Sequence, residues 1–200
     1  MKDFWEQRYS EKGWAYGTEP NVFLTTQVAR FKPGMRALVV GDGEGRNGVW
    51  LAQQGLDVLS VDYSAAGLRK ARELAIANGT RIKTECADLT QWQWPVAAFD
   101  VVVSIYLHFP AEVRTAMHRA MVQALKPGGV LILEAFNKNQ LQYQSGGPPV
   151  AAMLYTSDEL RADFSGTQIE ILEDTIAQLN EGRYHVGPGA VLRLVLTRDK

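Results

Sequence analysis

Short apolar runs alternate with helical patterns along most of the chain. The runs lie at residues 37–40, 56–61, 99–105 and 130–136. Between them, apolar positions recur at helical spacing and predict three helices, over about 46–54, 64–79 and 111–125. Apolar strands separated by helices are typical of a parallel sheet that is covered on both faces. The pattern therefore predicts an α/β fold.

The pattern changes towards the C-terminus. Residues 168–176 and 190–198 face each other across a loop, which predicts an antiparallel strand pair. Thr156 and Glu159 have the spacing of a capping box, which predicts that a short helix begins there. The Gly-Gly-Pro-Pro insert at 146–149 fits either a mobile active-site loop or a simple turn, and we favour the turn.

The N-terminal segment is rich in aromatic residues. Trp5 and Tyr9 fall on one helix face, and Trp14 and Tyr16 follow them. This segment could fold over a bound ligand and exclude water, or it could pack on an edge of the sheet. The loop-like surroundings of Tyr16 favour a ligand contact for that residue. After it, an amphipathic helix with a core-facing side is predicted by the spacing of Phe23, Leu24, Val28 and Phe31.

Composition places the chain among ordinary globular proteins. Of its 200 residues, 46% are hydrophobic and 22% are charged, and the formal net charge is −1. A chain without a basic excess has no global field that attracts nucleic acid. One cysteine, Cys86, and three scattered histidines favour neither an intramolecular disulfide nor a zinc cluster. Without a secretory signal or a membrane-length apolar run, we expect a soluble, cytoplasmic protein that binds no metal.

A glycine-rich turn follows the first apolar run. Gly41, Gly43, Gly45 and Gly48 precede or begin the first predicted helix, where a bare backbone lets a ligand approach the helix N-terminus. Asp62 ends the second apolar run, about 20 residues after the first glycine. In a parallel sheet its carboxylate is placed to accept hydrogen bonds from both hydroxyls of a ribose.

Two ligands fit this turn. The last three glycines match the G-x-G-x-x-G of dinucleotide-binding enzymes, but Gly41 already occupies the place directly after the strand. Asp42 and Glu44 would also repel a pyrophosphate, whereas a ligand with a sulfonium and an ammonium group would tolerate them. We therefore favour S-adenosylmethionine over a nicotinamide dinucleotide, and either ligand over a turn that binds nothing.

Further motifs follow in a fixed order. After GDGEGRN at 41–47 and Asp62 come Ala87-Asp88-Leu89, FDVVVSIYLHF at 99–109, LKPGG at 125–129 and the terminal strand pair. In this order the chain resembles the class I S-adenosylmethionine-dependent methyltransferases over nearly its whole length. The segment from Trp5 to Tyr9 followed by YGTEPN, and the run EGRYHVG at 181–187, are most similar to the small tellurite-resistance and thiopurine methyltransferase type.

The resemblance implies a particular architecture. The fold would be a Rossmann-like, doubly wound, mostly parallel seven-stranded sheet with a C-terminal antiparallel hairpin. Residues 1–200 would form a single methyltransferase domain, in which 1–32 are an N-terminal helical cap or lid and 33–200 are the cofactor-binding core.

The resemblance also assigns cofactor-binding residues. They correspond to Gly41, Asp42, Gly43, Asp62, Tyr63, Asp88, Leu89, Ser104 and Ile105. The first three would line the methionine end of S-adenosylmethionine, Asp62 would hold the ribose, and the last two would close the pocket. Tyr63 would pack beside the adenine, Asp88 would accept from its amino group, and Leu89 would offer its backbone. Without the resemblance, Asp88 fits a turn equally well.

One position departs from the family pattern. Such enzymes usually carry an acid two residues before the first loop glycine, where this chain has Val39. The loop hydrogen bonds or ammonium contacts which that acid supports must then come from elsewhere, and Asp42 is a candidate. We expect weaker cofactor binding rather than none.

Methyl transfer from a sulfonium depends mainly on positioning. A thiolate, a halide or a metalloid oxyanion arrives as a ready nucleophile, whereas a hydroxyl or an amine generally needs a base. The catalytic candidates are His185, His108 and Tyr16. For His108 a structural role is the favoured alternative, and His185 fits a solvated loop residue equally well. Further candidates near the sheet edge are Tyr106, Asn137 and Glu181.

Three further polar residues have a functional or a structural interpretation. Arg46 and Asn47 could orient an anionic acceptor, although Arg46 could instead pair with Asp42 or Glu44 at the surface. His118 lies on a helix flank and is expected to be structural.

The sequence thus predicts an enzyme that transfers a methyl group from S-adenosylmethionine to a small-molecule acceptor of the thiol, thiopurine or metalloid oxyanion type. One alternative is a non-catalytic protein that binds the cofactor or its product, S-adenosylhomocysteine. A less favoured alternative is an NAD-dependent oxidoreductase. We expect no nucleic-acid or membrane partner, and either a monomer or a homodimer.

Overall fold

The computed structural model describes residues 2–199, with the side chains of residues 3–199. They fall into two compact units. The N-terminal unit comprises Met1–Trp92 with Glu181–Tyr184, and the C-terminal unit comprises Gln93–Asn180 with His185–Lys200. Whether the chain is a single domain with a cap at 1–32 stays a prediction.

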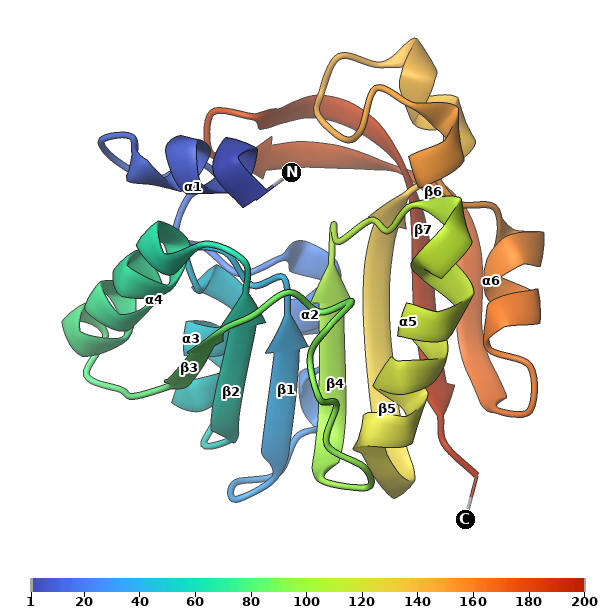
Figure 1. The fold of residues 1–200 in the computed structure, drawn as a ribbon, viewed down its shortest axis with the longest axis horizontal. Helices are drawn as coiled ribbons and strands as arrows, with labels where there is room; N and C mark the ends of the chain where they lie inside the picture. The colour runs from blue at the N-terminus through green and yellow to red at the C-terminus, as the bar shows by residue number, and fades with distance from the viewer. Residues whose placement is uncertain (1, 200) are drawn as a thin grey trace. The chain divides into compact units, whose positions relative to one another are not determined.

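The N-terminal unit is an α/β layer whose strands are parallel (Figure 1). Strand β2 pairs with β1 on one side and with β3 on the other, and the register places Asp62 opposite Cys86. The carboxyl ends of β2 and β3 therefore lie side by side. The elements of this unit are α1 (Lys2–Ser10), α2 (Val22–Thr26), a 3-10 turn (Val28–Arg30), β1 (Arg36–Val40), α3 (Arg46–Gln53), β2 (Asp57–Asp62), α4 (Ala65–Ala77) and β3 (Lys83–Cys86).

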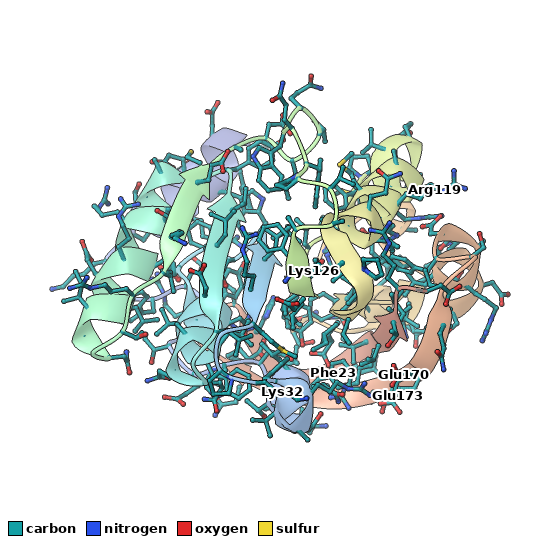
Figure 2. All side chains as sticks on the ribbon, turned by 90° about the horizontal axis from the view of Figure 1, so that it is seen from below. Phe23, Lys32, Arg119, Lys126, Glu170 and Glu173 are labelled. Atoms are coloured by element: carbon teal, nitrogen blue, oxygen red, sulfur yellow. The ribbon has the colours of Figure 1, made fainter. Side chains whose placement is uncertain are left out.

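The C-terminal unit combines parallel and antiparallel pairing. Its elements are β4 (Phe99–Ile105), α5 (Ala111–Ala124), β5 (Leu125–Phe136), two 3-10 turns (Lys138–Gln142 and Ala151–Met153), α6 (Ser157–Asp163), β6 (Gln168–Glu181) and β7 (His185–Thr197). Strand β5 pairs with β4 in parallel and with β7 in antiparallel fashion. Cross-strand contacts also join β7 to Glu170 and Glu173 of β6, both labelled in Figure 2. The Thr197 hydroxyl donates to Glu170 at 2.5 Å, and Arg193 lies 3.5 Å from Glu173.

The strands are ordered β3-β2-β1-β4-β5-β7-β6 in one seven-stranded sheet. The predicted fold class, a mostly parallel Rossmann-like sheet that ends in an antiparallel hairpin, is confirmed. The capping box predicted at Thr156 and Glu159 is confirmed as well, and a side-chain cap also begins α4. The Ser64 hydroxyl accepts from the Gly67 amide at 3.0 Å, and Thr156 and Glu159 form a reciprocal capping box.

One prediction for the N-terminal segment is wrong. The amphipathic helix predicted from Phe23 to Phe31 ends at Thr26, and Val28 is 46% exposed, so the core-facing side is shorter than its spacing indicates. Trp14 packs against Val49, Leu74 and Ala75, apart from the cluster that contains the other aromatic residues of this segment. Among the described residues, no helix has both the length and the apolar character needed to cross a membrane.

Candidate cofactor site

The glycine loop, residues 41–45, has a backbone conformation that side chains disfavour. Gly41, Gly43 and Gly45 have φ angles of 64°, 56° and 88°, in the left-handed region. A Cβ on Gly43 would lie 2.5 Å from the hydroxyl of Tyr9, and one on Gly45 would lie 2.5 Å from the Ala71 Cβ. The loop therefore needs glycine at these positions for its conformation and for its close packing.

Asp62 lies buried at the end of β2 and holds this loop. Its Oδ2 accepts from the Gly43 amide at 2.8 Å, and its Oδ1 accepts from the Ser64 amide at 2.8 Å. Burial raises the pKa of the Asp62 carboxyl to about 6, against the opposing effect of these amides. Each carboxylate oxygen has a second acceptor position, so the group can also accept from ribose hydroxyls.

The neighbouring strand end supplies the remaining predicted contacts of this unit. The Ala87 amide donates to the Asp62 carbonyl at 3.0 Å, which places the turn after β3 beside the end of β2. Burial raises the pKa of Tyr63, and the hydrogen bond between its hydroxyl and Asp88 raises it further. Asp88 also accepts from the amide and the hydroxyl of Thr90, at 2.9 and 2.7 Å. The fold thus brings Asp62, Tyr63, Asp88 and Leu89 together at one edge.

Asp42 is turned beneath the loop. Its Oδ1 accepts from the Gly48 amide at 3.3 Å, and its Oδ2 accepts a short hydrogen bond from the Ser60 hydroxyl. Burial raises the pKa of the Asp42 carboxyl to about 6. Asp42 therefore joins the first turn of α3 to β2 beneath the loop, and its replacement of the acid absent at Val39 stays a prediction. A Cβ on Gly48 would lie 2.4 Å from Asp42 Oδ2, so that glycine leaves room for the carboxylate.

Glu44 has a structural role, which reduces its expected contribution to the binding of a cationic ligand. Its Oε2 accepts from the Ala15 amide at 2.7 Å, and its Oε1 pairs with Lys70 Nζ at 2.8 Å. This carboxylate is thus already neutralised by a lysine. The preference of the loop for a cationic ligand consequently rests on Asp42 and Asp62.

The aromatic segment covers the loop within the same unit. Trp5 and Tyr9 stack with centroids 5.6 Å apart, which agrees with their prediction on one helix face. Tyr16 lies 6.3 Å from Tyr9 and 5.9 Å from Tyr184, again between centroids. Glu6 fixes α1 to the start of α4 by accepting from the Ser64 hydroxyl at 2.5 Å.

Arg46 and Asn47 have other partners than those predicted. Arg46 is 8% exposed and pairs with Glu181 at 3.0 Å, so a surface pair with Asp42 or Glu44 is wrong. The Asn47 side chain accepts from the Asn21 amide at 2.9 Å. Both residues therefore anchor the N-terminal segment.

The candidates in the C-terminal unit lie in buried surroundings. Ser104 and Ile105 end β4, and Ser104 Oγ is a buried atom without a hydrogen-bond partner in the described part of the chain. His185 begins β7 and is 5% exposed, so the solvated-loop alternative is wrong. Its ring lies 4.7 Å from that of Tyr106, edge to face. Tyr106 itself has φ of 54° and donates to Glu134 at 2.7 Å.

His108 is engaged through both ring nitrogens. Nε2 accepts from the Phe136 amide at 3.0 Å, and Nδ1 lies 3.2 Å from the Tyr106 carbonyl. Burial lowers the pKa of His108 to about 4, which keeps the ring neutral. This geometry favours the structural alternative for His108. His118 is structural as predicted, since it is 1% exposed and its Nδ1 bonds Asp163 at 2.9 Å.

Two functional contributions escaped the sequence analysis. Ser60 is a polar residue between Leu59 and Val61 in the middle of β2, and that irregularity is the signal in the sequence for its bond to Asp42. Lys70 bridges Glu44 and the carbonyls of Glu11 and Gly13, at 2.8, 2.8 and 2.6 Å. Nothing in the local sequence marks it.

Residues 37–129, which include this glycine loop, match the family model described as a methyltransferase domain. Over these residues the chain is similar to a methyltransferase domain, which agrees with the predicted resemblance to class I S-adenosylmethionine-dependent methyltransferases. The predicted family and its cofactor are confirmed. The glycine loop and the Asp62 carboxylate fit that cofactor, because they combine close backbone approach with anionic acceptors.

Known proteins similar to this methyltransferase domain act on different acceptors. Phosphoethanolamine N-methyltransferase 3 of Arabidopsis thaliana is 32% identical over 103 residues, which are 51% of this chain and 21% of that protein. Thiocyanate methyltransferase 1 of the same plant is 28% identical over 180 residues, or 85% and 76% of the two chains. The chain thus spans well under two thirds of the first relative's length, and the acceptor does not follow from it.

A solved structure shares the fold across the whole chain. It was described for the conversion of a disulfide bond into a thioacetal group during echinomycin biosynthesis, with a TM-score of 0.78 and 19% identity. The match covers 100% of this chain and 92% of that chain. This likeness concerns the fold alone.

Cofactor affinity of the methyltransferase domain should depend on pH. The pKa of Asp62 is about 6 without ligand, and only the ionised carboxylate keeps both amide bonds while accepting from ribose. Ligand binding then favours the ionised form, so affinity is full above the pKa and is lost below it. Between pH 7.5 and pH 5 we expect a loss of about tenfold, measured by calorimetric titration with S-adenosylhomocysteine. Constant affinity over this range would contradict the assignment of Asp62.

Proposed function

We propose that this chain transfers the methyl group of S-adenosylmethionine to a small acceptor with a thiol, thiopurine or metalloid oxyanion nucleophile. The observation that carries the proposal is the buried Asp62 carboxylate, which holds the glycine loop at Gly43 and has acceptor positions left for a ribose. The Asp42 carboxylate beneath the same loop supports binding of a cationic cofactor despite Val39.

The proposed reaction is an in-line displacement at the methyl carbon. A lone pair of the acceptor forms the new bond to carbon, while the carbon–sulfur bond breaks and its electron pair returns to sulfur. S-Adenosylmethionine supplies the activated methyl group and leaves as S-adenosylhomocysteine. An acceptor that is already ionised releases no proton in this step, so the chain must mainly position the reactants.

The state of the candidate bases supports such a ready nucleophile. Both His108 nitrogens contact backbone groups, and the Asn137 amide donates to Asp174 at 3.0 Å. A hydroxyl or amine acceptor that used His108 as its base would need the ring to leave a backbone partner. The similarity to a thiocyanate methyltransferase also fits a sulfur nucleophile that needs no base.

An acceptor screen tests the proposal. Purified protein with methyl-labelled S-adenosylmethionine is offered thiocyanate, a small thiol, a thiopurine and tellurite, with ethanolamine phosphate as the amine comparison. We expect label transfer to at least one of the first four and none to the amine. Binding of S-adenosylhomocysteine without transfer to any acceptor would favour the non-catalytic alternative, and absence of binding would overturn the proposal.

Substitution of His185 should affect kcat differently for acceptors that lose a proton and for acceptors that do not. If His185 takes a proton from the acceptor, His185→Ala should lower kcat with a protonated thiol while sparing S-adenosylhomocysteine affinity. With thiocyanate, which has no proton to lose, the same variant should keep kcat within about threefold, because base catalysis then contributes nothing. Initial rates with the two acceptors measure this difference. Equal losses with both would assign His185 a packing role beside Tyr106 and Phe136.

A further inference from the structure

The arginines of the N-terminal unit differ in whether a carboxylate neutralises their positive charge. Arg46, which the sequence offers as one candidate cation for an anionic acceptor, is neutralised by Glu181 at 3.0 Å. Arg183 pairs with Glu11 at 2.9 Å. Arg8, in α1, makes no ion pair with a carboxylate among the residues that the structure describes, although its side chain is half-buried.

Arg8 is instead surrounded by aromatic rings. The centre of its guanidinium lies 4.4 Å from the ring centroid of Phe4, 5.5 Å from that of Trp5 and 4.1 Å from that of Tyr184. One guanidinium nitrogen, Nη1, donates to the Tyr16 hydroxyl at 2.8 Å. Ring faces attract a cation but leave its charge unneutralised, so this site keeps a net positive charge.

This cation adjoins the residues that cover the glycine loop. Tyr9 follows Arg8 in α1 and packs against Gly43, and its ring lies 6.3 Å from that of Tyr16. The positive charge of Arg8 is also close enough to Tyr9 and Tyr16 to oppose the increase in their pKa values that burial causes. Two aromatic rings, Tyr16 and Tyr9, therefore connect Arg8 to the loop.

We propose that Arg8 is the recognition residue for an anionic methyl acceptor, held in place by the Tyr16 hydroxyl and the surrounding rings. The proposal rests on the proposed function and deepens it, because it restricts the acceptor to small anions such as thiocyanate, thiolates and metalloid oxyanions. A guanidinium has five N–H donors and is more weakly hydrated than an ammonium. Such a group binds large, weakly hydrated anions without a large desolvation cost.

Tyr16 acts through Arg8 in this arrangement. Its hydroxyl accepts from the guanidinium, and burial raises the pKa of Tyr16, so the ring stays neutral. A neutral hydroxyl orients Arg8 without cancelling its charge. Tyr16, which the sequence selects as a catalytic candidate, is thus a positioning residue.

The test compares Arg8→Met with Arg183→Met. Arg183 lies over the same Tyr184 ring, at 5.5 Å, but is already paired with Glu11. Loss of one charge-assisted contact should raise the KM for thiocyanate about tenfold or more in Arg8→Met, with kcat changed far less. Arg183→Met should keep the KM. Arg8→Lys, which retains charge but not the planar fork, should recover part of the loss.

Binding measurements keep the test independent of turnover. Stabilisation of the S-adenosylhomocysteine complex by thiocyanate is followed by thermal unfolding, and S-adenosylhomocysteine affinity itself by calorimetry. We expect Arg8→Met to lose the thiocyanate effect while binding the cofactor product within about threefold of the unsubstituted chain. Equal thiocyanate stabilisation in both proteins, or none in the unsubstituted protein, would overturn the role of Arg8. Failure of the proposed function would show separately, as absent methyl transfer or absent S-adenosylhomocysteine binding.

Discussion

Asp62→Ala should lower the affinity for S-adenosylhomocysteine by about a hundredfold, because hydrogen bonds to a charged acceptor contribute about 1.5–3 kcal/mol each. The substitution removes the proposed acceptor of the ribose hydroxyls and also frees the Gly43 amide that positions the glycine loop. Calorimetric titration at pH 7.5 measures the loss. Since the pKa of the buried carboxyl is raised to about 6, its removal also relieves a buried charge, and the variant should stay folded.

Asp57→Ala is the matched control for this variant. Asp57 begins the strand that Asp62 ends, and its carboxylate pairs with Lys83 at 2.9 Å in an exposed position. Exposed ion pairs contribute little to stability, so this variant should fold and bind as the unsubstituted chain does. Affinity within threefold in both variants would show that Asp62 contacts no ligand.

The order of strands and helices can be predicted from the sequence, because strands buried on both faces of a sheet are continuous apolar runs. Strands β1, β2, β4 and β5 lie where continuous apolar runs predict them, and helices α3 and α4 end close to Gly55 and Gly79, a residue type that typically ends helices. The positions of Asp62 and Asp88 also followed, since parallel strands end at a common edge. These inferences need only the spacing of residues along the chain.

The partners of charged residues are harder to predict from the sequence, because they lie on segments that are distant along the chain. Arg46 pairs with Glu181 and not with its neighbours in the glycine loop. Trp14 leaves the aromatic segment because Val49 and Leu74 provide an apolar contact elsewhere. Local spacing contains no information on either choice. The state of Arg8 is a further case, since a cation surrounded by rings has the same local sequence as a solvated one.

The roles of the histidines can be predicted from the sequence only in part. The sequence places His108 after a strand that ends at the cofactor edge, which suits a ligand contact as well as a structural role. Its partners are backbone groups of Tyr106 and Phe136. Backbone donors and acceptors are present at every position, so no residue type in the sequence marks them.

Asp42→Asn should make the free protein more stable and weaken its cofactor binding. Asparagine keeps an acceptor for the Gly48 amide and a polar partner for the Ser60 hydroxyl, but it removes the buried charge. The folded-state pKa of Asp42 is about 6 against an ordinary value of 3.8, so ionisation costs stability as pH rises through this interval. Above pH 6 the variant should gain up to about 3 kcal/mol in the free energy of unfolding, and below pH 4 nothing. Urea unfolding at pH 3.5 and 7.5 measures the gain.

Comparing S-adenosylmethionine with S-adenosylhomocysteine shows whether Asp42 acts on the ligand through its negative charge or only by holding the loop. S-Adenosylmethionine carries a sulfonium, whereas S-adenosylhomocysteine carries a neutral sulfur in nearly the same skeleton. If the negative charge of Asp42 favours the sulfonium through the loop, Asp42→Asn should weaken S-adenosylmethionine binding more than S-adenosylhomocysteine binding, by about fivefold in the ratio of the two affinities. An unchanged ratio would limit Asp42 to holding the loop through Gly48 and Ser60. Asp42 would then replace the acid missing at Val39 in its structural role alone.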